Sequence, residues 1–369
     1  MAIEHRHENE INQYLLFKLS NIAGVIPWYD FKKQKLSYES LYKLYGILLA
    51  VFVLVTTLIC FYNIRQDVAF NSPLLNGLKV LGEATSLLLF LLIVSGSSFW
   101  NMKSWEQFIN LLPHTDCRLK CNRKYFLNIP FVAAIAGCIH PFIVYGFALE
   151  AGEIILAQHM LVIHFTRHIM ICLMYHVISL LRNMYDTVNK SLVRIKLCAV
   201  INSSTIEDLQ ELQTIYVEAD KIVCTFNIVF GWPLLLLFTQ TVASMLLILS
   251  TFTENGLNIR LKEILTEKII LMTLFHTVAM VCGPVVITFS CDAVVNKANM
   301  LLKMCSKLCE DLPLLVREKE ELARLHDIIQ SKKPKFSVLS LFEIRRSTLL
   351  SLISVTTTYM IVILQYNYL

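Results

Sequence analysis

The chain has 369 residues, of which 56% are hydrophobic and 17% are charged, and its formal net charge is +5. Its mean hydropathy of +0.58 excludes an ordinary soluble domain and is typical of a protein that crosses the membrane several times. The positive charge requires no nucleic-acid partner, because basic loops beside anionic lipid account for it.

Several apolar runs are long enough to cross a bilayer, which takes about 20 helical residues. They lie at about 44–64, 78–99, 126–149, 154–181, 226–252, 268–291 and 347–366. The fourth run is the most polar, because His159, His164, Arg167 and His168 interrupt it. The sequence therefore predicts an all-α membrane protein with seven transmembrane helices, which forms a single domain over residues 1–369.

Lys and Arg residues concentrate in alternate segments between these runs. They are frequent before the first run, between the second and third, after the fourth, and most of all after the sixth. The other segments hold few basic residues, namely Arg65, Lys79, Arg260, Lys262 and Lys268. Because cytosolic loops carry the excess of Lys and Arg, we predict a cytosolic N-terminus and an extracellular C-terminus.

Helical patterns continue past the fourth and sixth runs and before the fifth. Apolar residues recur every three or four positions there, and a separate helix is predicted at 314–329. We therefore expect cytosolic helices over about 182–225 and 292–346. One chain could fold these helices on themselves, but apolar stripes on both arms favour burial against neighbouring copies.

The last run carries a thin polar stripe. Its polar residues are spaced three, four or seven positions apart and fall within roughly 60° of one helix face. They are Ser347, Ser351, Ser354, Thr358 and Gln365. Two interpretations remain open: the hydroxyls bond back to carbonyls or pack between helices, or the stripe lines a water-filled path.

The same helix carries a family resemblance. Thr358-Tyr359, five apolar residues and then Gln365-Tyr366 resemble the signature at the end of insect gustatory receptors, which have Phe where this chain has Tyr366. The segment 336–344 also resembles the stretch before the last helix in that family. The resemblance implies a tastant-gated, non-selective cation channel in the plasma membrane. It also implies a homotetramer, or a heteromer with other gustatory receptors, joined by the cytosolic helices.

A pore interpretation of the last helix follows from this resemblance. In a fourfold assembly, Gln365 or Tyr366 narrows the path near its outer mouth, and Ile361, one turn deeper, closes it by excluding water. Thr358 and Ser354 continue the polar lining. Because the helix offers no ring of carboxylates, a weakly selective cation pore is expected.

Polar residues inside the other runs are the candidates for binding a ligand. An ionisable or amide side chain in hydrocarbon is costly, so each needs a partner or a function. The candidates are Glu83, His140, Tyr145, His159, His164, Arg167, Gln240 and His276. Either Arg167 pairs with Glu83 or a carbonyl and the histidines pack neutrally, or these groups bind a small polar ligand in a pocket in the outer half of spans two to six. The resemblance favours the pocket.

Other functions fit the sequence less well. An insect odorant receptor channel subunit is the nearest alternative, and a seven-helix G-protein-coupled receptor has the opposite charge bias. No phosphate loop or catalytic motif indicates an enzyme, and the cysteine spacing indicates neither a metal site nor a cofactor. Met360 stands where the sugar receptors of the resembling family carry an acidic residue, so sugars, bitter compounds and other nutrients all remain possible tastants.

Overall fold

The fold is helical almost throughout. The computed structural model describes residues 16–30, 35–36, 39–67, 73–118, 154–197, 204–257, 263–311 and 316–368. Its helices are α2 (Glu39–Asp67), α3 (Pro73–Ser95), the π-helical turn η1 (Gly96–Trp100), α4 (Met102–Arg118), α6 (Ile154–Leu197), α7 (Ser204–Leu257), α8 (Glu263–Asp311), α9 (Val316–Ser331) and α10 (Arg346–Tyr368). Two short antiparallel hairpins pair β1 (Tyr29–Asp30) with β2 (Lys35–Leu36) and β3 (Ser337–Val338) with β4 (Phe342–Glu343).

The prediction of an all-α membrane protein is confirmed. Within the described part of the chain, α2, α3, α6, α7 and α8 are each long and apolar enough to span a bilayer. The last helix, α10, has 23 residues and is therefore about 34 Å long, enough to cross a hydrocarbon core of about 30 Å. The predicted run 126–149 lies outside the described residues.

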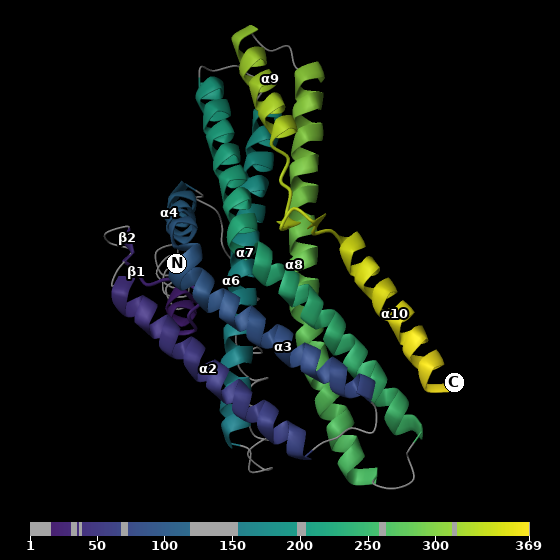
Figure 1. The fold of residues 1–369 in the computed structure, drawn as a ribbon. Coiled ribbons are helices and arrows are strands. Elements are labelled where there is room, and N and C mark those ends of the chain that lie inside the picture. The colour runs from purple at the N-terminus through teal and green to yellow at the C-terminus, as the bar shows by residue number, and fades with distance from the viewer. Residues whose placement is uncertain are drawn as a thin grey trace.

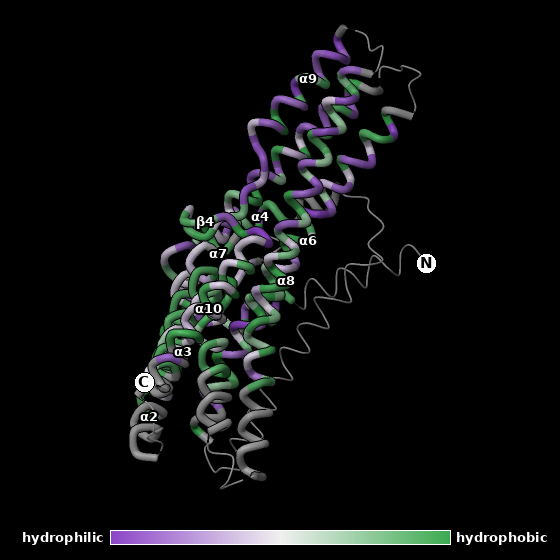
Figure 2. Tube along the Cα trace, turned by 90° about the vertical axis from the view of Figure 1, so that its right-hand side faces the viewer, coloured by the Kyte–Doolittle hydropathy of each residue, from purple (hydrophilic) through white to green (hydrophobic). Residues whose placement is uncertain are grey.

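Three helices are much longer than a membrane crossing. α6, α7 and α8 have 44, 54 and 49 residues, which correspond to about 65–80 Å. The helical continuations predicted beyond the apolar runs are therefore present, and α9 is the separate helix expected at 314–329. Figure 2 shows hydrophilic residues gathered at the end of the molecule where α9 lies, and hydrophobic residues over the part around α3 and α10.

The apolar stripes of these extensions pack on one another within the chain. α9 lies beside the ends of α7 and α8 in Figure 1. The stripe residues are buried in one continuous core, and they include Met184, Val188, Leu192, Leu209, Leu212, Ile215, Val294, Leu301, Leu308, Leu322, Leu325 and Ile329. For these residues the structure shows the first of the two alternatives, in which the helices of one chain bury one another: α6 packs on α7 and α8, and α9 packs on α7 and α8.

Polar contacts fix the same extensions in place. The hydroxyl of Tyr216 on α7 donates to the carbonyl of Lys332, just after α9, at 2.9 Å. The ammonium of Lys297 on α8 pairs with the carboxylate of Asp186 on α6. One contact thus joins α7 to the end of α9 and the other joins α6 to α8, so both stabilise the packing of the extension.

The β3–β4 hairpin turns through two residues with positive φ. Leu339 and Ser340 have φ of 51° and 60°, and the amide of Leu341 donates to the carbonyl of Val338 at 2.8 Å. Positive φ at both central positions is the mark of a type I′ turn, which normally uses Asn or Gly. The leucine and serine in this turn are therefore strained, and the hairpin keeps them so because its strands are fixed by packing.

We predict that Ser340→Gly stabilises the protein by about 0.5–1 kcal/mol. Glycine removes a left-handed penalty of about 1–2 kcal/mol, part of which is offset by the extra freedom of glycine in the unfolded chain. Thermal unfolding of the purified chain measures the change. The matched control is Ser337→Gly in β3, where glycine should lower stability instead. Equal shifts in both variants would contradict the assignment of strain to Ser340.

Candidate functional site

One face of α10 packs on the bundle, and the polar stripe lies on the opposite face. Thr356 is the most buried of the described side chains of this helix, and its hydroxyl lies 3.9 Å from the sulfur of Met245 on α7. Thr356 and Gln365 are nine residues apart, a rotation of about 180° at 100° per residue. The stripe residues Ser347, Ser351, Ser354, Thr358 and Gln365 are all exposed in the single chain.

The hydroxyls of the stripe also bond to the helix that carries them. Thr358 donates to the carbonyl of Ser354 at 2.9 Å, and Ser351 donates to that of Ser347 at 3.1 Å. These hydrogen bonds agree with the first interpretation, in which the hydroxyls bond back to carbonyls of their own helix. The exposure of the stripe agrees with the second, in which it lines a water-filled path. Ile361 is 51% exposed beside it, and the side chain of Tyr366 is outside the described residues.

The segment before α10 is fixed to α7 and α8. The side chain of Asn227 on α7 donates to the carbonyl of Lys335 at 2.7 Å and accepts from the amide of Ser337 at 3.0 Å. At the start of α10, the guanidinium of Arg346 pairs with Asp292 of α8 at 2.8 Å. Movement of α7 or α8 therefore acts directly on the base of α10.

A buried arginine meets a proline-freed carbonyl at the contact of α6 and α8. Arg167 is 1% exposed, and its Nη2 donates to the carbonyl of Met280 at 2.7 Å. Pro284 lies four residues after Met280 in α8 and has no N–H, so this carbonyl lacks its helical donor. The hydroxyl of Thr241 on α7 approaches the same oxygen at 3.5 Å. The structure thus shows the carbonyl pairing that was one of the two expected for Arg167.

The arginine keeps further hydrogen-bonding capacity. Its Nε and Nη1 are buried and have no hydrogen-bond partner among the described residues. The same holds for the Oε1 of Gln240, whose Nε2 donates to Ser86 of α3. Buried polar groups are nearly always paired in folded proteins, so groups such as these are expected to meet water or a ligand.

The other candidates are spread over neighbouring helix contacts. Nδ1 of His159 lies 3.1 Å from the hydroxyl of Thr56 and joins α6 to α2. The rings of His164 and His276 meet edge to face, with centroids 5.1 Å apart, and join α6 to α8. Glu83 is half-buried on α3, and His140 and Tyr145 lie outside the described residues. The candidates therefore line the contacts of α6 with α2 and α8 and of α3 with α7.

Comparison with known proteins identifies the family. Residues 13–369 match the family model described as "7tm Chemosensory receptor". The chain belongs to this seven-transmembrane chemosensory receptor family. The resemblance drawn from the end of the sequence is thus confirmed at the level of the superfamily, and the family is one of receptors and not of enzymes.

Solved structures support the same fold for this receptor. It is similar to the insect olfactory receptor OR5 from Machilis hrabei, with 13% sequence identity, a TM-score of 0.69 and 99% of each chain covered. A second structure, OR5 in complex with eugenol, gives a TM-score of 0.62 at 13% identity and covers 98% of the receptor and 100% of OR5. No curated protein matches the sequence.

Two prolines inside the long helices were not predicted to matter from the sequence. Pro284 creates the acceptor that Arg167 meets, and Pro233 removes the helical donor of the Val229 carbonyl in α7. The available signal was a proline inside an apolar run, four residues after a potential acceptor. What the sequence did not provide was the lateral register of the helices, which determines the side chain opposite each carbonyl.

Proposed function

We propose that this receptor is a gustatory receptor acting as a tastant-gated, non-selective cation channel of the plasma membrane. The supporting observation is the position of the family motif: the stripe that ends in Gln365 lies opposite the face of α10 that Thr356 anchors to the bundle. A polar face turned away from its own chain is suited to a water-filled path shared with other copies.

The pore proposal assigns roles along α10. Four copies placed around one axis bring together their Gln365 and Tyr366 side chains near the outer mouth. Ile361 forms the hydrophobic constriction below them, and Thr358 and Ser354 continue the polar wall. The copies are identical in a homotetramer, and other gustatory receptors supply some of them in a heteromer.

The ligand proposal rests on the buried polar groups between the helices. Acceptor groups on a small-molecule tastant would pair with the remaining donors of Arg167, and a donor group on it would pair with the Oε1 of Gln240. The rings of His164 and His276 are further candidates of the same proposal. The same proposal includes Glu83, His140, Tyr145 and His159 as candidates of the pocket. Binding there would shift α8 relative to α6, and the Arg346–Asp292 pair transmits that shift to α10.

Whole-cell recording tests this function. Cells that express the receptor alone are perfused with sugars and bitter compounds while G-protein signalling is blocked. A ligand-evoked cation current that persists under the block supports the channel. A response that the block abolishes would instead establish a G-protein-coupled receptor. For silent cells with receptor at the surface, co-expression with other gustatory receptors tests the heteromer.

An odorant receptor subunit is the second candidate. The observation in its favour is the likeness in fold to the olfactory receptor OR5, although 13% identity carries no ligand preference. The recording therefore includes volatile compounds, and eugenol among them, because OR5 was solved with it. A current evoked by volatile compounds and by none of the sugars or bitter compounds would favour the odorant assignment.

A further inference from the structure

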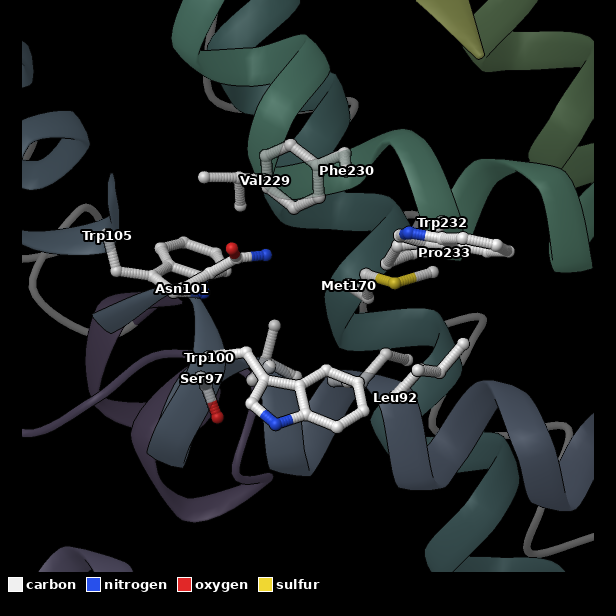
Figure 3. Close-up of a pocket in the computed structure, with 13 residues that line it drawn as sticks. Leu92, Ser97, Trp100, Asn101, Trp105, Met170, Val229, Phe230, Trp232 and Pro233 are labelled. Carbon is white, nitrogen blue, oxygen red and sulfur yellow. The ribbon is translucent and has the colours of Figure 1, made fainter. Parts of the chain in front are cut away.

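A pocket separate from the polar candidates opens where α3, α4 and α7 meet. It is lined by Val25, Leu92, Ile93, Gly96, Ser97, Trp100, Asn101, Trp105, Met170, Val229, Phe230, Trp232 and Pro233. Figure 3 shows the labelled side chains around an open centre, with Trp105 and Asn101 on one side and Trp232 and Pro233 on the other. The space enclosed between these side chains is about 30 Å³, and it widens into a groove of about 420 Å³ that includes space open to the outside.

The backbone around the pocket is unusual on both sides. η1 forms one wall, and the amide of Asn101 donates to the carbonyl of Gly96 at 2.9 Å, five residues back. Such π-helical turns are rare and are frequent at functional sites. On the other wall, Pro233 deprives the Val229 carbonyl of its helical donor. The pocket thus combines apolar walls with a carbonyl acceptor and the side-chain amide of Asn101.

The pocket faces the membrane near its edge. Trp100 and Trp232 are 75% and 55% exposed at its mouth, although both belong to membrane-length helical segments. Tryptophan is enriched where hydrocarbon meets water. α4, which starts beside the pocket, lies in Figure 2 between the hydrophobic part and the hydrophilic end that carries α9. In the predicted orientation this is the cytosolic edge of the membrane.

The chemistry of the walls selects among membrane lipids. Among the described side chains that line the pocket, none is charged. Phosphate and carboxylate head groups attract Lys and Arg, so an anionic lipid or a fatty acid finds no counter-charge here. A rigid, uncharged body with a single hydroxyl suits the site better, because it loses little conformational entropy on binding. We propose that the pocket binds a membrane sterol, whose hydroxyl meets the side-chain amide of Asn101 and the Val229 carbonyl.

The same turn of α7 contacts the segment that leads into α10. The rings of Trp105 and Phe230 in the pocket meet edge to face, with their centroids 5.4 Å apart. From Phe230 the ring contacts continue to Phe226, with centroids 4.8 Å apart, and from Phe226 to Phe336, with centroids 5.6 Å apart. A Cβ placed on Gly231 would lie 3.1 Å from the side chain of Leu339, so the backbone of α7 touches the β3–β4 turn. Sterol occupancy therefore stabilises the segment 335–344 at the base of α10.

Photolabelling of the full-length receptor in lipid nanodiscs tests the site. A photoactivatable cholesterol analogue should label peptides that contain Trp100 and Trp232, and excess cholesterol should compete. Gly96 has open space where a side chain would begin, so Gly96→Leu fills the pocket and should reduce labelling at least fivefold. Gly77→Leu, on an exposed and equally open position of α3, should leave labelling unchanged.

Other results would overturn the proposal. Labelling that is insensitive to Gly96→Leu places the sterol elsewhere, and competition by an uncharged acylglycerol but not by cholesterol assigns the pocket to another lipid.

Hydrogen exchange tests the effect on α10 without depending on channel activity. Cholesterol should slow exchange at 335–344 in the native receptor and not in Gly96→Leu, and unchanged exchange would refute the link to α10. Trp232→Ala, which removes an exposed wall, repeats the test if Gly96→Leu fails to fold.

Discussion

Arg167→Met is expected to weaken the response to a tastant by about 10- to 150-fold while the receptor remains folded. A hydrogen bond to a charged group contributes about 1.5–3 kcal/mol, and each 1.4 kcal/mol is tenfold in affinity. The fold is expected to survive, because a methionine of similar length relieves the burial of a charge whose hydrogen-bond partner among the described residues is the Met280 carbonyl. Concentration–response curves for the tastant found by recording, together with thermal unfolding, measure both effects.

Thr241→Val is the matched control for this prediction. Its hydroxyl approaches the same Met280 carbonyl at 3.5 Å, so the variant perturbs the proline-freed acceptor without removing the charge. We expect its half-maximal concentration to stay within about threefold of the native value. An unchanged response in Arg167→Met would show that the arginine only satisfies the proline-freed carbonyl of α8. A loss of Arg167→Met from the cell surface would also show that the role of the arginine is structural.

The fold could be predicted where hydrophobicity or helical periodicity dominates. Apolar runs of membrane length and the continuation of α6, α7 and α8 beyond them follow from composition and spacing alone. The partner of each apolar stripe could not be predicted, because any other stripe provides an equally favourable surface. The packing of α6 on α7 and α8 and of α9 on α7 and α8 decides it, and the position of α9 depends on contacts such as the one between Tyr216 and Lys332.

The sequence indicated which residues are candidates for the site, but it did not indicate which groups they contact. The cost of burying polar groups directed attention to Arg167 and Gln240, and both are buried in the structure. The acceptor for Arg167 is a main-chain carbonyl, which every residue possesses, so only the register of α6 against α8 identifies it. The π-helical turn η1 and the positive φ of Leu339 and Ser340 also left no signal, because their residues are not the types those conformations usually select.

The proposed ligand site and the proposed pore depend on different features of the structure. Ligand recognition depends on contacts between several helices, whereas the pore lining follows from the angular positions of residues on a single helix. The stripe that the sequence placed on α10 is therefore found where its spacing required, opposite Thr356. What α10 faces in the assembly depends on copies of the chain, and substitutions at Gln365 report on it directly.

Substituting Gln365 with charged residues of opposite sign is expected to change ion conduction in opposite directions. In a fourfold assembly, Gln365→Glu places a ring of carboxylates at the outer mouth and should raise permeability to Ca²⁺ relative to Na⁺. Gln365→Lys places four ammonium groups there and should reduce cation current at least tenfold, because like charges repel strongly in a narrow, weakly screened path. Reversal potentials in mixed solutions measure the first effect, and whole-cell current at matched surface expression measures the second.

Thr357→Ser is the control on the same helix. Thr357 is exposed but lies about 80° from Gln365 around the axis, and its hydroxyl bonds back to the carbonyl of Ile353 at 2.8 Å. Serine retains that hydroxyl, so conduction should be unaltered. If both Gln365 variants conduct like the native receptor, the stripe does not line the path. The exposed hydroxyls of α10 would then serve only to satisfy its own carbonyls, as the back-bonding of Thr358 to Ser354 already does.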